Sequence, residues 1–183
     1  MKNLRAGLVG LGMMGRHHAR VLASLPGVDF IGVSDPAGDV NGVAQGRPVV
    51  KSVAELIALG IDYAVVAVPT IYHLEIGLEL AAAGIHAMVE KPLSQDTATA
   101  KDLAKTFAHA GLVGAVGHIE RYNPALQEAR RRLEQLGSLY RCYAGLHKSA
   151  GSHLNQHGFV YPAKRISYKV ATLQLVQLLD RAI

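Results

Sequence analysis

The sequence has few cysteines and no long apolar run, and both absences narrow the kind of protein it encodes. Cys142 is the only cysteine among 183 residues, so no internal disulfide can form, which fits a reducing cytoplasm. No apolar stretch approaches the roughly 18 residues that a membrane-spanning helix needs. Lys2 and Arg5 precede an apolar stretch as in a signal peptide, but glycines interrupt that stretch and no small-residue cleavage site follows. We expect a cytoplasmic protein without a membrane segment.

Charged residues are also scarce, and their placement argues against a nucleic-acid partner. They make up 18% of the chain against 50% hydrophobic residues, so a packed core is expected. Residues 1–140 are balanced in charge, and the net charge of +5 lies entirely beyond them. The only dense basic run, 130–132, would face Glu128 and Glu134 on a helix, which is typical of a solvated helix face. We expect no nucleic acid to bind.

Short apolar runs alternate with segments of helical spacing along most of the chain. The predicted strands are 4–10, 28–35, 62–69, 86–90 and 112–118. The predicted helices are 14–25, 52–60, 73–84, 96–110 and 124–137, and residues 36–47 are expected to be a loop or a weak helix. Such alternation predicts an α/β fold, a doubly wound parallel sheet with helices on both faces.

A glycine-rich turn stands where the first predicted strand gives way to the first predicted helix. Gly10, Gly12 and Gly15 have the GxGxxG spacing of dinucleotide-binding Rossmann domains. In that motif the first glycine permits a tight turn, the second lets backbone approach a pyrophosphate, and the third lets helix and strand pack closely. The helix N-terminus offers N–H donors to the phosphates. Met13 and Met14 are expected to pack over this cofactor-binding turn.

An acidic residue follows the turn at the distance that the dinucleotide motif requires. Asp35 lies 20 residues after Gly15, at the end of the second predicted strand. Its carboxylate could accept hydrogen bonds from the adenosine ribose and would repel a 2′-phosphate. Because no basic residue directly follows Asp35, the sequence favours NAD over NADP as the cofactor. A structural glycine turn with an unrelated surface aspartate is the alternative.

Four motifs together resemble one family of oxidoreductases. They are the turn 10–15, "VAVPTIYH" (66–73), "VEKPLS" (89–94) and "GHIERYNPA" (117–125), in the order and spacing of the Gfo/Idh/MocA family. The last motif is most similar to the branch that oxidises a ring hydroxyl of UDP-N-acetylhexosamines. The resemblance covers about residues 1–140 and implies a Rossmann domain followed by a substrate domain.

The resemblance assigns roles to individual residues in these motifs. It implies that Pro69, Thr70 and His73 line the cofactor cleft and that Glu90 contacts the cofactor. Lys91 would lie beside the nicotinamide and the sugar as the catalytic residue, and the family often makes the following Lys-Pro bond cis.

Two chemical roles for Lys91 remain open at this point. Near a positively charged nicotinamide, and partly desolvated, its pKa would fall, which suits proton exchange with a hydroxyl. The ammonium group could instead polarise the developing alkoxide or carbonyl, and an ordinary surface lysine is the remaining alternative. The resemblance further implies that Arg121 reaches the cofactor, and that Tyr122 and Asn123 reach the substrate.

The end of the chain departs from the family. We expect residues 1–137 to form the Rossmann domain and 138–183 to be a remnant or diverged start of the substrate domain, which in the family is a much longer open β-sheet. The family's catalytic histidine would align loosely at Leu173, within "KVATLQLV" (169–176). The apolar side of this predicted terminal helix could cover an exposed edge or form a homo-oligomer contact.

Two functions from different classes therefore remain open. The first is an NAD-dependent oxidoreductase that oxidises a ring hydroxyl of a sugar, a nucleotide sugar or a cyclitol. The second is an NAD-binding but catalytically inactive module that acts as a partner or sensor. Both functions would use the same cofactor motifs, so only the sequence of the tail distinguishes between them.

The histidines outside these motifs offer no clear chemistry. His17 and His18 are expected to pack or face solvent, while His118 is either a structural hydrogen-bonder or a cleft residue. The remaining candidates for a metal site, His147, His153 and His157, have no cysteine or acidic partner at ligand spacing. No metal is expected.

Overall fold

The computed structural model describes residues 3–133, which belong to two compact units, 3–119 and 120–133. The units are treated separately below. The predicted domain boundary at 137, the tail 138–183 and the loose alignment of Leu173 lie outside the described residues. The oligomer contact predicted for the tail therefore stays a prediction.

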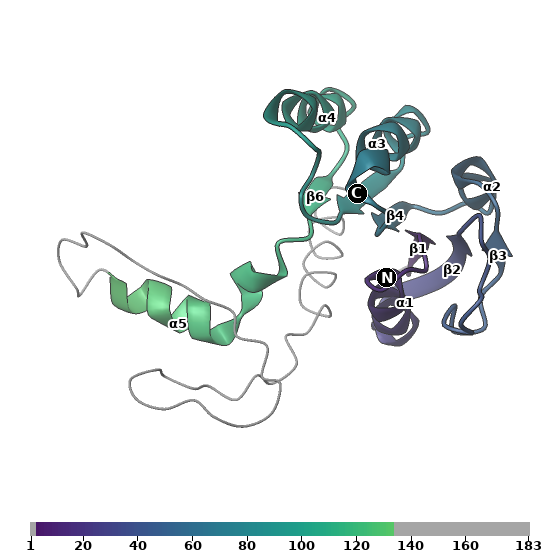
Figure 1. The fold of residues 1–183 in the computed structure, drawn as a ribbon, viewed down its shortest axis with the longest axis horizontal. Coiled ribbons are helices and arrows are strands. Elements are labelled where there is room, and N and C mark those ends of the chain that lie inside the picture. Colours follow the sequence, from purple (N-terminus) through teal and green to yellow (C-terminus); the bar gives the residue numbers. More distant parts are fainter. Residues whose placement is uncertain (1–2, 134–183) are drawn as a thin grey trace. The chain divides into compact units, whose positions relative to one another are not determined.

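The first unit is built around one parallel sheet, as the alternating pattern predicts (Figure 1). Its strands are β1 (Leu4–Val9), β2 (Val28–Ser34), β3 (Val49–Val50), β4 (Tyr63–Val66), β5 (His86–Val89) and β6 (Gly114–Val116). They lie in the order β3-β2-β1-β4-β5-β6, and every neighbouring pair is parallel. The chain order reverses between β1 and β4, which is where open α/β sheets bind ligands.

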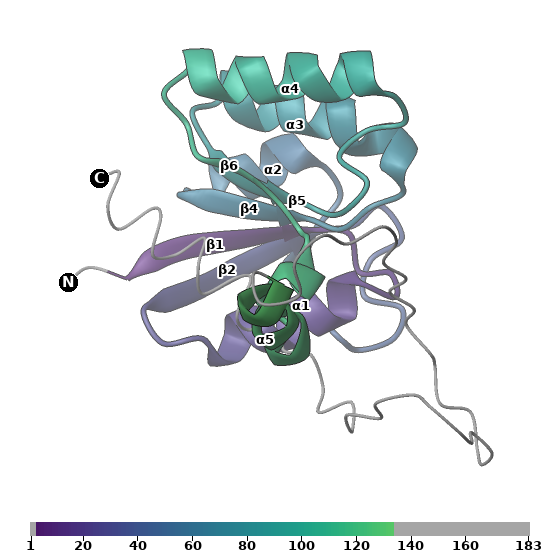
Figure 2. The same ribbon diagram turned by 90° about the vertical axis from the view of Figure 1, so that its left-hand side faces the viewer.

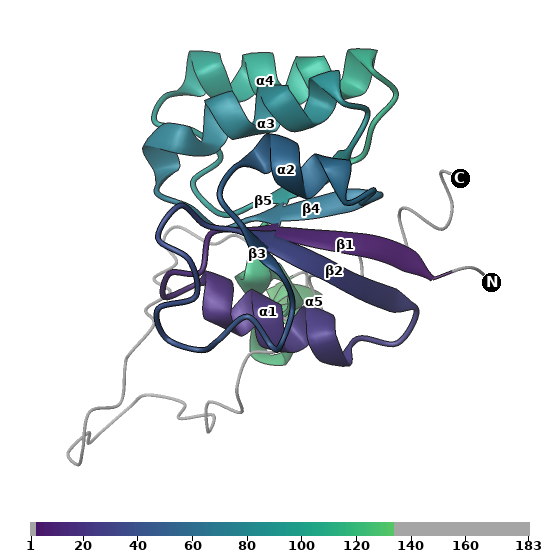
Figure 3. The same cartoon turned by 90° about the vertical axis from the view of Figure 1, so that its right-hand side faces the viewer.

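Helices cover both faces of this sheet, so the doubly wound α/β prediction is confirmed. They are α1 (Gly15–Ser24), α2 (Val53–Ala58), α3 (His73–Ala82) and α4 (Thr97–His109). Figures 2 and 3 show α2, α3 and α4 on one face and α1 on the other. The core between the sheet and the three-helix face contains Leu56, Leu80, Leu103 and Phe107, all buried.

Residue types at the helix ends explain where the helices begin and end. The Ser52 hydroxyl accepts a hydrogen bond from the Glu55 N–H, which caps α2, and Gly60 follows the helix with a φ of 76°. Asp96 caps α4 by accepting hydrogen bonds from the N–H groups of Ala98 and Thr99. These local signals are why the predicted and observed helices differ by only a few residues.

Two short elements of the first unit were absent from the sequence prediction. β3 is a two-residue strand beside β2, and η1 (Thr70–Tyr72) is a single turn between β4 and α3. Residues 36–47, predicted as a loop or a weak helix, are irregular. Both missed elements are too short to produce a periodic pattern, which needs several residues of strand or helix.

The described part of the second unit is one helix and the turn before it. η2 (Ile119–Tyr122) leads into α5 (Pro124–Leu133), so the helix predicted at 124–137 is confirmed as far as Leu133. Glu128 forms exposed ion pairs with Arg131 and Arg132. This is the solvated charged face that the sequence predicted for that basic run.

Candidate cofactor-binding site

The glycine turn lies at the carboxyl end of β1, where the sheet order reverses. Gly10 has a φ of 94°, a conformation that favours glycine, and its N–H donates to the Ser34 carbonyl at 2.8 Å. A Cβ atom on Gly10 would lie 2.7 Å from the Ala67 carbonyl oxygen. Only glycine fits at this junction between the ends of β1, β2 and β4.

Gly12 and Gly15 serve opposite purposes in the same turn. A Cβ atom on Gly15 would lie 1.9 Å from the Gly10 carbonyl oxygen, so the absent side chain lets α1 begin against the turn. A Cβ atom on Gly12 would meet nothing within 4 Å. The exposed Gly12 backbone therefore borders open space, as an approaching pyrophosphate would require.

The N-terminus of α1 is suited to an anion. The helix has no acidic residue in its first turn and no side-chain cap, and basic residues follow at once. Met14 occupies the cap position, and Met13 is 71% exposed beside it. With the open backbone at Gly12, this end of the helix can accept a negatively charged phosphate.

Asp35 is held in a fixed orientation at the end of β2. One carboxylate oxygen accepts the Leu11 N–H at 2.7 Å, and the other accepts the Ala37 N–H at 2.8 Å. The side chain thus links the glycine turn to the turn after β2. Each oxygen keeps further lone-pair capacity, so the half-buried carboxylate can also accept hydroxyl protons of a ribose.

The residues after β4 divide into an exposed part and a buried one. Pro69 is exposed and Thr70 is half-buried at the start of η1, which follows β4, the neighbour of β1 in the sheet. His73, by contrast, is only 1% exposed. Its Nδ1 lies 2.9 Å from the Pro92 carbonyl oxygen, and its Nε2 lies 3.0 Å from that of Val68. His73 therefore ties the end of β4 to the segment after β5.

Glu90 follows β5 as a buried carboxylate with both oxygens engaged. Its Oε1 lies 2.8 Å from Nε2 of His18, which is fully buried on α1, and its Oε2 accepts the Lys91 N–H at 3.2 Å. A Cβ atom on Gly117 would lie 3.2 Å from the Glu90 carboxyl carbon. The absence of a side chain at Gly117 lets its backbone pack closely against the carboxylate. Sequence analysis missed His18 as a partner.

The environment of Glu90 favours its ionised form. Burial raises the pKa of the carboxyl group, but the hydrogen bond and charge of His18 oppose this, as do the Lys91 N–H and ammonium. The net effect is a pKa below the ordinary value. A buried carboxylate kept ionised by a histidine thus stands one residue before the predicted catalytic lysine.

Lys91 itself is exposed, at the same edge of the sheet. The Lys91-Pro92 bond is cis, as the family resemblance implies. Among the described residues, Lys91 forms no ion pair through its side chain. Its ammonium group is therefore free of a fixed carboxylate partner and can act on a ligand at the carboxyl ends of the strands.

The predicted site residues of the second unit form their own hydrogen-bond cluster. The Asn123 side chain accepts the Ala125 N–H at 3.0 Å and donates to Glu120 at 2.9 Å, so it caps α5. The Arg121 carbonyl accepts from the Gln127 side chain, and Tyr122 is half-buried. Their predicted contacts with cofactor and substrate stay predictions.

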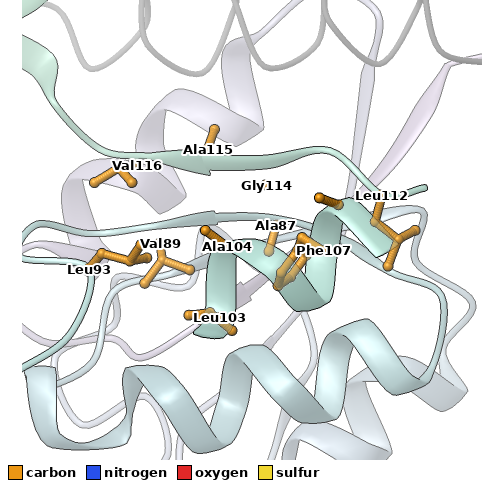
Figure 4. Close-up of a pocket in the computed structure, with 11 residues that line it drawn as sticks. Ala87, Val89, Leu93, Leu103, Ala104, Phe107, Leu112, Gly114, Ala115 and Val116 are labelled. Carbon is orange, nitrogen blue, oxygen red and sulfur yellow. The ribbon is translucent and has the colours of Figure 1, made fainter. Parts of the chain in front are cut away.

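An apolar pocket of the first unit lies between α4 and the strands β5 and β6. Figure 4 shows Leu103 and Phe107 of α4 opposite Ala87 and Val89 of β5. The cavity holds about 200 Å³, and none of its lining side chains carries a polar group. It has no residue for acid-base chemistry, so the strand ends remain the candidate site.

Metal and membrane features can be assessed only for residues 3–133. There, no cluster of three or more His, Cys, Asp or Glu side chains could hold a metal ion. None of the helices in this part of the chain is long and apolar enough to span a membrane. The three histidines of the tail lie outside the described residues.

Comparison with known proteins places the chain in a family. The model of the Gfo/Idh/MocA oxidoreductase family, described as an NAD-binding Rossmann fold, matches residues 4–118. This chain belongs to the Gfo/Idh/MocA oxidoreductase family. The family assignment predicted from the four motifs is thereby confirmed, and the matched segment includes the glycine turn, Asp35, Glu90 and Lys91.

Similar proteins include dehydrogenases of nucleotide sugars and cyclitols. The UDP-N-acetylglucosamine 3-dehydrogenase of Acidithiobacillus ferrooxidans is 34% identical over 134 residues, covering 72% of this chain and 42% of that protein. The scyllo-inositol 2-dehydrogenase (NAD(+)) of Bacillus subtilis is 29% identical over 137 residues, covering 72% and 40%. The WlbA dehydrogenase from Bordetella pertussis, solved with NADH and UDP-GlcNAcA, matches with a TM-score of 0.68 at 28% identity, covering 73% and 40%. This Gfo/Idh/MocA chain spans less than half the length of these relatives.

Proposed function

We propose that this chain is the cofactor-binding part of an NAD-dependent oxidoreductase that oxidises a ring hydroxyl of a sugar, a nucleotide sugar or a cyclitol. The observation that carries the proposal is the arrangement at the point where the strand order reverses, between β1 and β4. An open glycine backbone, an uncapped helix N-terminus and a fixed carboxylate lie together there. The activities of the similar dehydrogenases support the substrate class.

Residues of the strand ends would each hold a different part of the dinucleotide. The Gly12 backbone and the N-terminus of α1 would bind the pyrophosphate, and Asp35 would accept hydrogen bonds from the adenosine ribose. Pro69 and Thr70 would border the cleft after β4. When bound, NAD accepts a hydride from the carbon that bears the substrate hydroxyl.

Lys91 would handle the proton of the substrate hydroxyl. Oxidation of a secondary alcohol releases that proton, and the exposed Nζ can accept it when neutral or polarise the oxygen when charged. Glu90 does not compete for this role, because it is buried and its oxygens already bind His18 and the Lys91 N–H. We assign Glu90 to positioning the Lys91 backbone rather than to direct contact with the cofactor.

A second function is favoured by the sequence of the tail. Leu173 stands where the loose family alignment puts a catalytic histidine, so this chain would bind NAD without oxidising a substrate. Such a module would act as a partner or sensor. Turnover of substrate, not cofactor binding, separates the two functions.

Calorimetric titration with NADH tests the shared requirement of both functions. We expect micromolar binding to the wild-type chain and loss of most of this affinity in Gly12→Val. The added side chain would project into the open space where the phosphates are expected, with no contact that disturbs the fold. Ala82→Val, on the exposed end of α3, adds similar bulk elsewhere and should bind NADH normally. Absence of NADH binding to the wild-type chain would refute the proposal.

A further inference from the structure

A basic side chain from another strand lies beside the Asp35 turn. Lys51 directly follows β3, the short strand that sequence analysis missed. Its Nζ donates a hydrogen bond to the Pro36 carbonyl at 3.0 Å. The Asp35 N–H, in turn, donates to the Val50 carbonyl at 3.0 Å, so the ends of β2 and β3 are joined at this point.

The ammonium group of Lys51 is held over this turn without being neutralised. A Cβ atom on Gly38 would lie 3.4 Å from Nζ, so the glycine leaves room for the group. The described residues form no ion pair with Lys51, since the nearby Glu55 carboxylate accepts the Lys51 backbone N–H instead. An ammonium group has three N–H donors, and two remain available after the bond to Pro36.

This position matters for the choice between NAD and NADP. In Rossmann sites, the acidic residue after the second strand binds the 2′-hydroxyl of the adenosine ribose, and a cation nearby accommodates a 2′-phosphate. Pro36, which Lys51 contacts, is the residue next to Asp35 in the chain. We propose that Lys51 binds the 2′-phosphate of NADP and so lets this chain accept NADPH as well as NADH. The inference rests on the proposed function, because it concerns the same cofactor site.

Asp35 and Lys51 would act in opposite directions on the phosphate. The carboxylate repels it and the ammonium attracts it, so NADH should still bind more tightly than NADPH. Because Lys51 is exposed, its attraction should weaken as salt is added. A preference set by two opposed side chains explains why a sequence without a basic residue directly after Asp35 can still accept the phosphate.

Parallel titrations of NADH and NADPH test this inference in wild type, Lys51→Gln and a matched control. The control is Lys101→Gln, which removes an exposed lysine from α4. For Lys51→Gln we expect the NADPH dissociation constant to rise about fivefold, the scale of one exposed charge pair, with little change for NADH. Lys101→Gln should change neither. The difference in NADPH affinity between wild type and Lys51→Gln should become smaller in high salt.

Adenosine 2′,5′-bisphosphate and AMP provide a second readout that does not involve the nicotinamide. Lys51→Gln should weaken the bisphosphate and leave AMP unchanged. Equal effects on both cofactors, no effect on NADPH, or failure of the wild type to bind NADPH while it binds NADH would overturn the inference and leave the proposed function standing. Failure to bind NADH and NADPH alike would overturn both.

Discussion

At the scale of single residues, the pair His18 and Glu90 joins two motifs that lie far apart in the sequence. His18 is on the helix that follows the glycine turn, and Glu90 precedes Lys91. Removing one partner of a buried pair leaves the other without compensation, which is costly in a protein interior. The pair therefore links the helix after the glycine turn to the residue before the predicted catalytic lysine.

The lowered pKa of Glu90 predicts a specific acid sensitivity. A carboxyl group with a lower pKa in the folded state adds stability above its unfolded-state pKa of about 4.3 and loses it as the pH falls through the folded-state value. A glutamine at this position, as in Glu90→Gln, has no carboxyl group to titrate. We expect the free energy of unfolding of this variant to be about 1–3 kcal/mol lower than wild type at neutral pH and to fall less on acidification.

Urea unfolding of wild type and Glu90→Gln at a series of pH values measures this difference. Glu79→Gln removes an exposed carboxylate from α3 and should follow the wild-type curve. Parallel pH curves for wild type and Glu90→Gln would show that the ionised carboxylate contributes no stability.

Local sequence can predict Asp35 but not the partner of Glu90. Asp35 follows its glycine motif at a fixed distance, because both belong to one strand-helix-strand unit. His18 and Glu90 are 72 residues apart, and only the packing of α1 beneath the strand ends brings them together. For the same reason, the burial of His73 between two carbonyls could not be inferred from its motif alone.

At the scale of elements, the contact of α1 with the turn after β1 depends on one missing side chain. A Cβ atom on Gly15 would lie 1.9 Å from a backbone oxygen, which cannot move aside as the end of a side chain can. Gly15→Ala should therefore displace the start of α1 and lower the free energy of unfolding by about 3 kcal/mol or more.

Gly12→Ala is the matched control, since it adds the same methyl group one turn earlier. Nothing lies within 4 Å of its Cβ position, so we expect a change within about 0.5 kcal/mol. Denaturant melts of both variants check the contrast. Equal stability of the two would contradict the packing role of Gly15 and leave only a binding role for the motif.

Long elements with their own end signals were predictable, and short ones were not. Helix α2 has a serine cap and a closing glycine, and the strands β1, β2, β4 and β5 are mostly apolar. β3 exists because its two residues pair with the end of β2, which the sequence around Val49 does not reveal. Lys51, for which we propose a contact with the cofactor, directly follows that missed strand.

At the scale of the whole molecule, the sheet order gathers residues that the chain keeps apart. Gly12, Asp35, Thr70 and Lys91 follow β1, β2, β4 and β5, which are neighbours in the parallel sheet. Because parallel strands place their carboxyl ends at one edge, a single surface receives all four. The described fold thus brings together, at one edge of the sheet, the residues to which we assign dinucleotide binding.

Turnover is the property that tests the molecule as a whole, because it needs both the cofactor edge and a bound sugar. The test is the rate of oxidation of UDP-N-acetylglucosamine or scyllo-inositol with NAD, measured by the absorbance of the NADH formed. We expect this rate to fall at least about 100-fold in Lys91→Met, because the group that accepts the hydroxyl proton or polarises the oxygen is removed. NADH affinity should change by no more than about fivefold, the scale of one exposed charge pair. Lys101→Met on α4 should keep full activity.

Undiminished turnover in Lys91→Met would rule out the catalytic role of Lys91. NADH binding without any turnover by the wild-type chain would favour the inactive module.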